Sequence, residues 1–303
     1  MFRKILVPLD GSRLAEAALP VARWFADRLG SEVTLLHVME QKPPPRVHGE
    51  HHLTRPEEAA AYLEAIAASA FGPGQTVAAH VHTTSTAQVD HSIAEHRAEL
   101  AADLIVMCGH GDSGLRDLLF GSVAQRASAL GTVPVLFVRA RAVHAPTPFH
   151  CGKLLVPTDG EPHHEQGLAA AREIARPAGA LVLLLSVVPT WSQLRGRSLT
   201  SARMLPGTTQ AALEMTAESL RAHLGELASE LRQEGFEATA EVQRGDPAAR
   251  IVATAAETRA DLIVMATHGK TGGSAFWEGS VTPKVLKDTF VPVLLVPVAD
   301  GRA

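Results

Sequence analysis

This 303-residue chain has few cysteines, no long hydrophobic run and no excess of basic charge. Its two cysteines, Cys108 and Cys151, are too few for the disulfide framework of a small secreted protein. Apolar stretches such as residues 180–188 reach only about half of the ~20 residues that a membrane-spanning helix needs. Because no charged-then-apolar signal segment opens the chain either, we expect a cytoplasmic protein with no membrane association.

The charge balance and the missing catalytic motifs exclude further classes. The formal net charge is −4, so the chain lacks the basic field that nucleic-acid-binding proteins usually have, and we expect no nucleic-acid partner. It contains no G-x-S-x-G nucleophile elbow and no glycine loop ending in the GK[ST] of a Walker motif. Nothing in the sequence specifies efficient turnover, so we expect a binding protein and no enzyme, while slow ATP hydrolysis stays open wherever a metal and water reach the phosphates.

What the chain does contain is an internal repeat. KILVPLDGS at 4–12 returns as KLLVPTDGE at 153–161, an offset of 149 residues, and ADLIVM at 102–107 returns at 260–265, an offset of 158. The gain of nine residues falls between the second and third strands of the repeat. The sequence therefore predicts two homologous domains, residues 1–140 and 151–299, joined by a linker at 141–150.

The hydrophobic pattern predicts an α/β fold in each half. In the first half we expect strands at about 3–8, 32–38, 76–82, 103–107 and 134–138, separated by helices such as the one over 12–29. The strand runs are too uniformly apolar for a sheet with one wet face. A parallel sheet covered by helices on both faces, and built from right-handed crossovers, is therefore predicted.

Two glycine loops follow the repeated DLIVM strand. In a parallel sheet, ligands bind outside the carboxyl ends of the strands, which is where these loops begin. The glycines let the backbone approach a ligand, and a serine directly before the next helix adds a hydroxyl to that helix's free N–H groups. Both features favour a phosphate. The residues concerned are Gly109, Gly111, Gly121 and Ser122 in the first half, with Gly269, Gly279 and Ser280 in the second.

The first strand of each half ends in an aspartate. Asp10 and Asp159 are placed to accept a hydrogen bond from an exocyclic amine or a ribose hydroxyl, and Pro8 and Pro157 remove a ladder N–H near the sheet end. An acidic acceptor, apolar walls and an anion cradle together fit a nucleoside phosphate. An aspartate before a glycine is also a common helix cap and turn, and that structural interpretation stays open.

The VP-x-D-G opening, the DLIVM run and the HG-x9-GS spacing each occur twice, and together they resemble the universal stress protein family in its tandem form. The resemblance implies two Rossmann-like domains of the adenine nucleotide alpha hydrolase-like type, each with five parallel strands in the order 3-2-1-4-5. It also implies binding of ATP, AMP or ADP, with magnesium, as a regulatory module in stress responses. Further site residues expected on this basis are Val38, Val123, Val187, Ala266, His268, Lys270 and Val281.

The two sites are not expected to be equal. The first glycine of the family's loop is Cys108 in one half and Ala266 in the other. Lys270 follows the second half's loop glycine and suits a phosphate, whereas Asp112 in the first half repels one. These differences favour the second half, which also has a Gly245-Asp246-Pro247 turn where the first half has Ala87-Gln88-Val89.

Two other hypotheses stay open. One is an interaction scaffold that binds no nucleotide, its loops degenerate at Cys108, Asp112, Glu161 and Glu278. The other is a metal-responsive protein using the histidines of HGEHH at 48–52, although we expect these to be surface residues without a metal. The resemblance further suggests pairing through the fifth strands, VPVLFV and VPVLLV, within one chain or in a homodimer. The stress, the pathway and the protein partners are not encoded in any motif.

Overall fold

Uniformly apolar runs form the central strands of two units in the computed structural model. The model describes residues 1–109, 133–140, 148–161, 166–194, 200, 204–268 and 281–298. The first unit contains the described residues up to His150 together with His268 and 292–298. The second contains the described residues of 151–267 together with 281–291.

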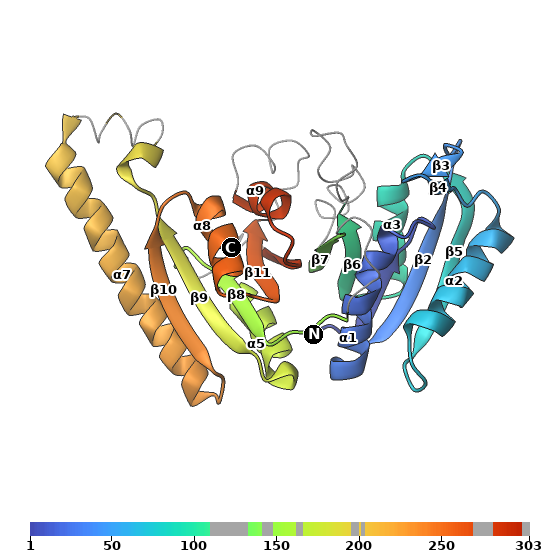
Figure 1. The fold of residues 1–303 in the computed structure, drawn as a ribbon, viewed down its shortest axis with the longest axis horizontal. Coiled ribbons are helices and arrows are strands. Elements are labelled where there is room, and N and C mark those ends of the chain that lie inside the picture. Colours follow the sequence, from blue (N-terminus) through green and yellow to red (C-terminus); the bar gives the residue numbers. More distant parts are fainter. Residues whose placement is uncertain are drawn as a thin grey trace. The chain divides into compact units, whose positions relative to one another are not determined.

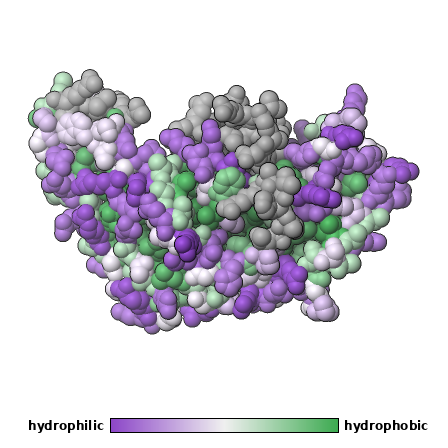
Figure 2. All heavy atoms as spheres, in the orientation of Figure 1, coloured by the Kyte–Doolittle hydropathy of each residue, from purple (hydrophilic) through white to green (hydrophobic). Residues whose placement is uncertain are grey.

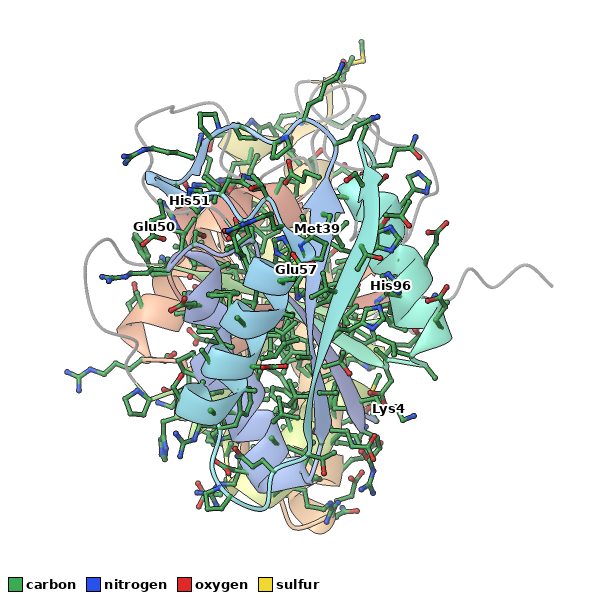
Figure 3. All side chains as sticks on the ribbon, turned by 90° about the vertical axis from the view of Figure 1, so that its right-hand side faces the viewer. Lys4, Met39, Glu50, His51, Glu57 and His96 are labelled. Atoms are coloured by element: carbon green, nitrogen blue, oxygen red, sulfur yellow. The ribbon has the colours of Figure 1, made fainter. Side chains whose placement is uncertain are left out.

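The first unit is built on a sheet of strand order β5-β2-β1-β6-β7, all parallel. Helices α1 and α2 contact one face of this sheet and α3 contacts the opposite face (Figures 1 and 3). The elements are β1 (Lys4–Pro8), η1 (Ala15–Ala18), α1 (Leu19–Leu29), β2 (Glu32–Glu40), β3 (Arg46–Val47), β4 (Glu50–His51), α2 (Pro56–Ala70), β5 (Val77–Thr86), α3 (Val89–Glu99), β6 (Leu104–Gly109) and β7 (Val135–Arg139).

The second unit repeats this order as β10-β9-β8-β11, again parallel. Helices α5 and α7 contact one face, and α8 contacts β9 from the other (Figure 1). The elements are β8 (Lys153–Pro157), α5 (Gln166–Ala178), β9 (Leu181–Val188), η3 (Trp191–Gln193), α7 (Pro206–Gln233), β10 (Ala238–Arg244), α8 (Pro247–Glu257), β11 (Leu262–His268) and α9 (Val281–Asp288). The predicted α/β class, with a mostly parallel sheet and helices on both faces, is confirmed.

The last strand, β12 (Val293–Val298), belongs to the first unit. It pairs antiparallel with β7, with Val293 opposite Phe137 and Leu295 opposite Val135. Both strands are apolar and buried along this ladder. An apolar edge strand left unpaired is a template for aggregation, and the pairing removes that edge within a single chain.

Equivalent registers show how closely the two halves correspond. Lys4 lies opposite Glu32 on the neighbouring strand, and Lys153 lies opposite Leu181 at the same offset of 149 residues. The aspartate of each ADLIVM run accepts hydrogen bonds from backbone amides at the beginning of the first strand. Asp103 accepts them from Arg3 and Lys4. Asp261 accepts them from Gly152 and Lys153. This repeated acid therefore has a structural role.

The core of each unit consists of strand residues with helix residues packed on them. Ile5, Leu6 and Val7 of β1 are at most 1% exposed, and burial of each such side chain stabilises the fold by about 1.5–3 kcal/mol. The outer face of α7 is mainly exposed, and Figure 2 shows hydrophilic residues predominating on the left side of the molecule, where this helix lies. Within the described ranges, every helix is too short or too polar to traverse a bilayer.

The structure refines two sequence expectations. The helix expected over 12–29 begins as the 3-10 turn η1, and α1 starts only at Leu19, with Pro20 in its first turn. Proline is tolerated in that first turn because its missing N–H has no partner there. Residues 41–56 are rich in proline, glycine, arginine and histidine, which predicts an irregular excursion between the second strand and the second helix. This segment contains the antiparallel pair β3–β4, which that composition does not predict.

Candidate functional site

Asp10 and Asp159 lie just beyond the carboxyl ends of β1 and β8, the central strands of their units. The Asp10 Oδ1 atom accepts the Ser12 amide at 2.9 Å and the Ser12 hydroxyl at 2.6 Å. The Asp159 Oδ1 atom accepts the Glu161 amide at 3.1 Å. One carboxylate oxygen of each aspartate thus closes the turn, as the structural interpretation expects.

A glycine follows each of these aspartates and packs against a leucine. Gly11 has φ +88° and Gly160 has φ +83°, a region that side chains rarely adopt. A Cβ atom at Gly11 would lie 2.8 Å from Leu53, and one at Gly160 would lie 2.8 Å from Leu220. The close approach fixes the path of the backbone directly beside each aspartate.

In each unit, a buried polar side chain on the second strand in chain order, β2 or β9, hydrogen-bonds to the residue before the aspartate. The sequence did not predict either of these side chains. His37 Nδ1 donates to the Leu9 carbonyl at 2.8 Å, and the Ser186 hydroxyl donates to the Thr158 carbonyl at 2.6 Å. The two are again 149 residues apart. Each directly precedes one of the expected site residues, Val38 or Val187. The signal that could have identified them is a polar residue inside an otherwise apolar strand.

His37 is neutral for a physical reason. It is 2% exposed, and its Nε2 atom has no hydrogen-bond partner among the residues that the structure describes. Burial therefore lowers the pKa of His37 below its ordinary value, because a buried imidazolium would lose its hydration. The neutral ring, protonated at Nδ1, is the form that donates to the Leu9 carbonyl.

The expected apolar wall is brought beside Asp10. Val38 is 7% exposed, and Pro8 is half-buried at the end of β1. β6 runs parallel to β1, with Ile5 opposite Leu104, and the buried Gly109 ends β6 at the same edge of the sheet as Asp10. In the second unit, the corresponding Pro157 and Val187 are half-buried, and so is Ala266, which corresponds to Cys108.

The glycine loops lie outside the described residues. This applies to Gly111, Gly121, Ser122, Val123, Gly269, Lys270, Gly279 and Ser280, whose expected roles stay predictions. The backbone of His268 ends β11, and α9 begins at Val281, directly after Ser280. The chain order strand, glycine loop and helix start that the sequence predicts is therefore retained in the second half.

The Gly245-Asp246-Pro247 turn distinguishes the second half from the first. The Asp246 side chain accepts the Ala249 amide at 3.0 Å and so caps α8. The corresponding helix of the first unit, α3, begins after Gln88, and among the described residues the Gln88 side chain makes no capping hydrogen bond to this helix. Lys284 Nζ lies 4.0 Å from Asp246 Oδ2 and brings a positive charge from α9 to this cap.

The cysteine and histidine side chains were candidates for redox chemistry or metal binding. Burial raises the pKa of Cys108 to about 12, which opposes a reactive thiolate there. His52 is 2% exposed, so the expectation that all histidines of HGEHH lie on the surface is wrong. His96 Nε2 lies 2.9 Å from His82 Nδ1. Within the part of the chain that the structure describes, three or more His, Cys, Asp or Glu side chains nowhere gather in a way that suits a metal ion.

Comparisons with known proteins agree with this architecture. A universal stress protein YxiE of Bacillus subtilis is 30% identical over 154 residues, covering 46% of this chain and 100% of its own. Universal stress protein MJ0531 of Methanocaldococcus jannaschii is 33% identical over 146 residues, covering 48% and 81%. The crystal structure of a universal stress protein from Archaeoglobus fulgidus matches the fold with a TM-score of 0.73 at 18% identity, covering 98% of this chain and 97% of that one.

The matches to single relatives span about half of this chain, as a repeat of two halves predicts. The model of the universal stress protein family matches twice, at residues 1–139 and 151–297. These two segments take in both aspartate turns and both glycine loops. The chain therefore belongs to the universal stress protein family, with two family domains in tandem.

Proposed function

We propose that the protein binds an adenine nucleotide, ATP or AMP, and acts as a regulatory module through that binding. The observation that carries the proposal is the repeated arrangement at Asp10 and Asp159. Each unit presents a carboxylate at the carboxyl end of its central strand, between a valine-bearing strand and a strand that leads into a glycine loop. Ligands of parallel α/β sheets bind at this edge.

The chemistry of the described residues fits the nucleoside part. Oδ1 of each aspartate closes the turn, and a carboxylate has further lone pairs that suit an exocyclic amine or a ribose hydroxyl. Val38 and Val187 supply the apolar wall on the neighbouring strand. His37 and Ser186 act as positioning residues, because each ties the carbonyl before the aspartate to the second strand.

The phosphates are assigned to the glycine loops on the basis of the sequence. In the second half, Gly269, Gly279 and Ser280 lead into α9, whose first N–H groups have no partner within the helix and suit an anion. Magnesium would neutralise part of the phosphate charge. Lys270 supports the second half as the tighter site.

The proposed mechanism is a population shift. A nucleotide that contacts both the aspartate turn and the glycine loop selects the conformation in which the two are correctly spaced. A partner that recognises this conformation then responds to the nucleotide. No residue is assigned a catalytic role, because binding alone supplies the signal.

The test begins with the purified protein as isolated. Denaturation should release bound adenine nucleotide, which is then detected in the supernatant. Titration of ATP with magnesium should show binding to the wild type, and Gly279→Val should weaken it more than Gly121→Val does, because the bulky side chain fills the predicted phosphate seat. Absence of binding at millimolar ATP in the wild type would instead support the nucleotide-independent scaffold.

A further inference from the structure

A short β-hairpin of defined geometry follows β2 in the first unit. β3 and β4 pair antiparallel, with Arg46 opposite His51 and Val47 opposite Glu50. The two loop residues, His48 and Gly49, have φ of 49° and 86°. Two consecutive positive values are typical of the type I′ turn, which matches the twist of paired strands. The turn geometry therefore fixes the directions in which the hairpin side chains project.

This hairpin contacts the turn that carries Asp10. His48 Nε2 lies 3.7 Å from Asp10 Oδ2. Glu50 Oε2 accepts the Arg13 amide at 2.6 Å, and Glu50 Oε1 lies 3.5 Å from Arg13 Nε. Figure 3 shows Glu50 and His51 at the same end of the sheet as Met39, away from Lys4 at the start of β1. The hairpin therefore lies at the edge where the nucleotide is proposed to bind.

Both oxygens of Asp10 consequently lie near polar groups of the protein itself. Oδ1 accepts from Ser12 and Oδ2 faces His48, and the Asp10 side chain is 34% exposed. The second half differs in sequence, because residues 189–213, which connect β9 to the first part of α7, contain no His, Asp or Glu. That segment therefore contains no histidine or acidic counterpart of His48 and Glu50, and its charged residues are Arg195, Arg197 and Arg203.

We propose that the β3–β4 hairpin is a cover over the first nucleotide site, and that its His48 competes with the nucleotide for Asp10. This inference rests on the proposed function. Nucleotide binds the first half only when the hairpin is displaced, so the apparent affinity is reduced by the fraction of molecules in which the site is open. Residues 189–213 of the second half contain no histidine in the place of His48, so we expect the two halves to respond to different nucleotide concentrations.

The decisive variant is His48→Ala combined with Glu50→Ala, which removes the polar contacts of the hairpin with the turn. The matched control is His51→Ala, since this exposed residue lies on the same hairpin without a contact to the turn. Equilibrium dialysis with ATP and magnesium counts the nucleotides bound per chain. Repeating it with Asp159→Asn, which weakens the second site, reports the first site alone.

The cover predicts one ATP per chain in the wild type at concentrations that saturate the second half. The double variant should bind a second ATP, with an affinity at the first half at least about tenfold higher than that of the wild type. His51→Ala should match the wild type. Saturating ATP should also increase amide hydrogen exchange across residues 46–51 of the wild type, because bound nucleotide displaces the hairpin.

Other outcomes overturn the inference in distinguishable ways. Two equal sites in the wild type, unchanged by the double variant, would refute the cover and leave the proposed function standing. No ATP bound by the wild type or by any variant would refute the proposed function and the cover with it. Hydrogen exchange of the Arg13 amide supplies a readout without nucleotide: it should rise in Glu50→Ala alone, and an unchanged rate would show that the hairpin is not docked.

Discussion

Alanine at Gly11 tests whether the turn after β1 is as tightly packed as the structure indicates. The positive φ of +88° destabilises an alanine by about 1–2 kcal/mol. Alanine also lowers the conformational entropy of the unfolded chain, which offsets about 0.4–1 kcal/mol of this cost. The new Cβ atom would lie 2.8 Å from both Cγ and Cδ1 of Leu53, and relief of such overpacking typically costs about 1–3 kcal/mol. We expect Gly11→Ala to lower the free energy of unfolding by about 2–3 kcal/mol.

Gly30→Ala is the matched control in the same unit. Gly30 also has a positive φ, +67°, but no atom of the described residues outside its own chain neighbours lies within 4 Å of the position of an added Cβ. Only the backbone cost applies, so we expect a loss of about 1 kcal/mol or less. In a Leu53→Ala background, Gly11→Ala should lose its steric component, and the coupling between the two substitutions should be about 1–2 kcal/mol.

Urea denaturation monitored by the fluorescence of Trp24 measures these differences. Trp24 is 7% exposed and lies in the first unit, and replacing Trp191 and Trp277 by phenylalanine leaves it as the only tryptophan reporter. The reasoning is refuted if Gly11→Ala and Gly30→Ala destabilise equally. It is also refuted if Leu53→Ala leaves the effect of Gly11→Ala unchanged.

Two further predictions concern buried titratable groups. Burial lowers the pKa of His37, so between that value and about 6.5 the unfolded chain binds more protons than the folded one, and stability should fall as the pH drops below about 6.5. Between pH 8 and pH 5, the urea midpoint should decline less in His37→Ser than in the wild type; serine is the residue found at the equivalent position 186. An identical decline in both proteins would contradict the assignment. Burial raises the pKa of Cys108 and of Cys151 to about 12, so a thiol reagent at pH 8 should label the native protein far more slowly than the urea-unfolded protein, as measured by intact mass. Rapid labelling of native Cys108 would contradict its burial.

The parallel sheets and the aspartate turns were predictable from the sequence because their signals are local. A strand buried on both faces is apolar throughout, as in ILV at 5–7 and LIVM at 104–107, and few other elements share that pattern. The duplication supplied a second copy of each motif. Because each motif occurs in both halves in the same order, a chance match is a poor explanation.

The contacts that shape the first site were not predictable, because they join residues distant in sequence. His37 and Leu9 are 28 residues apart, and the hairpin meets the turn through Glu50 and Arg13, which are 37 residues apart. Composition identified 41–56 as a turn-rich excursion, but it gave no direction for His48. That direction depends on a type I′ turn and on how the hairpin docks against the rest of the unit.

A crystal structure of the protein grown with ATP and magnesium tests the central claim most directly. We predict a nucleotide in the second unit, with a donor of its adenosine part within about 3.2 Å of the Asp159 carboxylate and its phosphates against residues 279–281 at the start of α9. A structure in which ATP at saturating concentration binds elsewhere, or in which the protein's own side chains fill both aspartate turns and leave no room for a purine, would contradict the account.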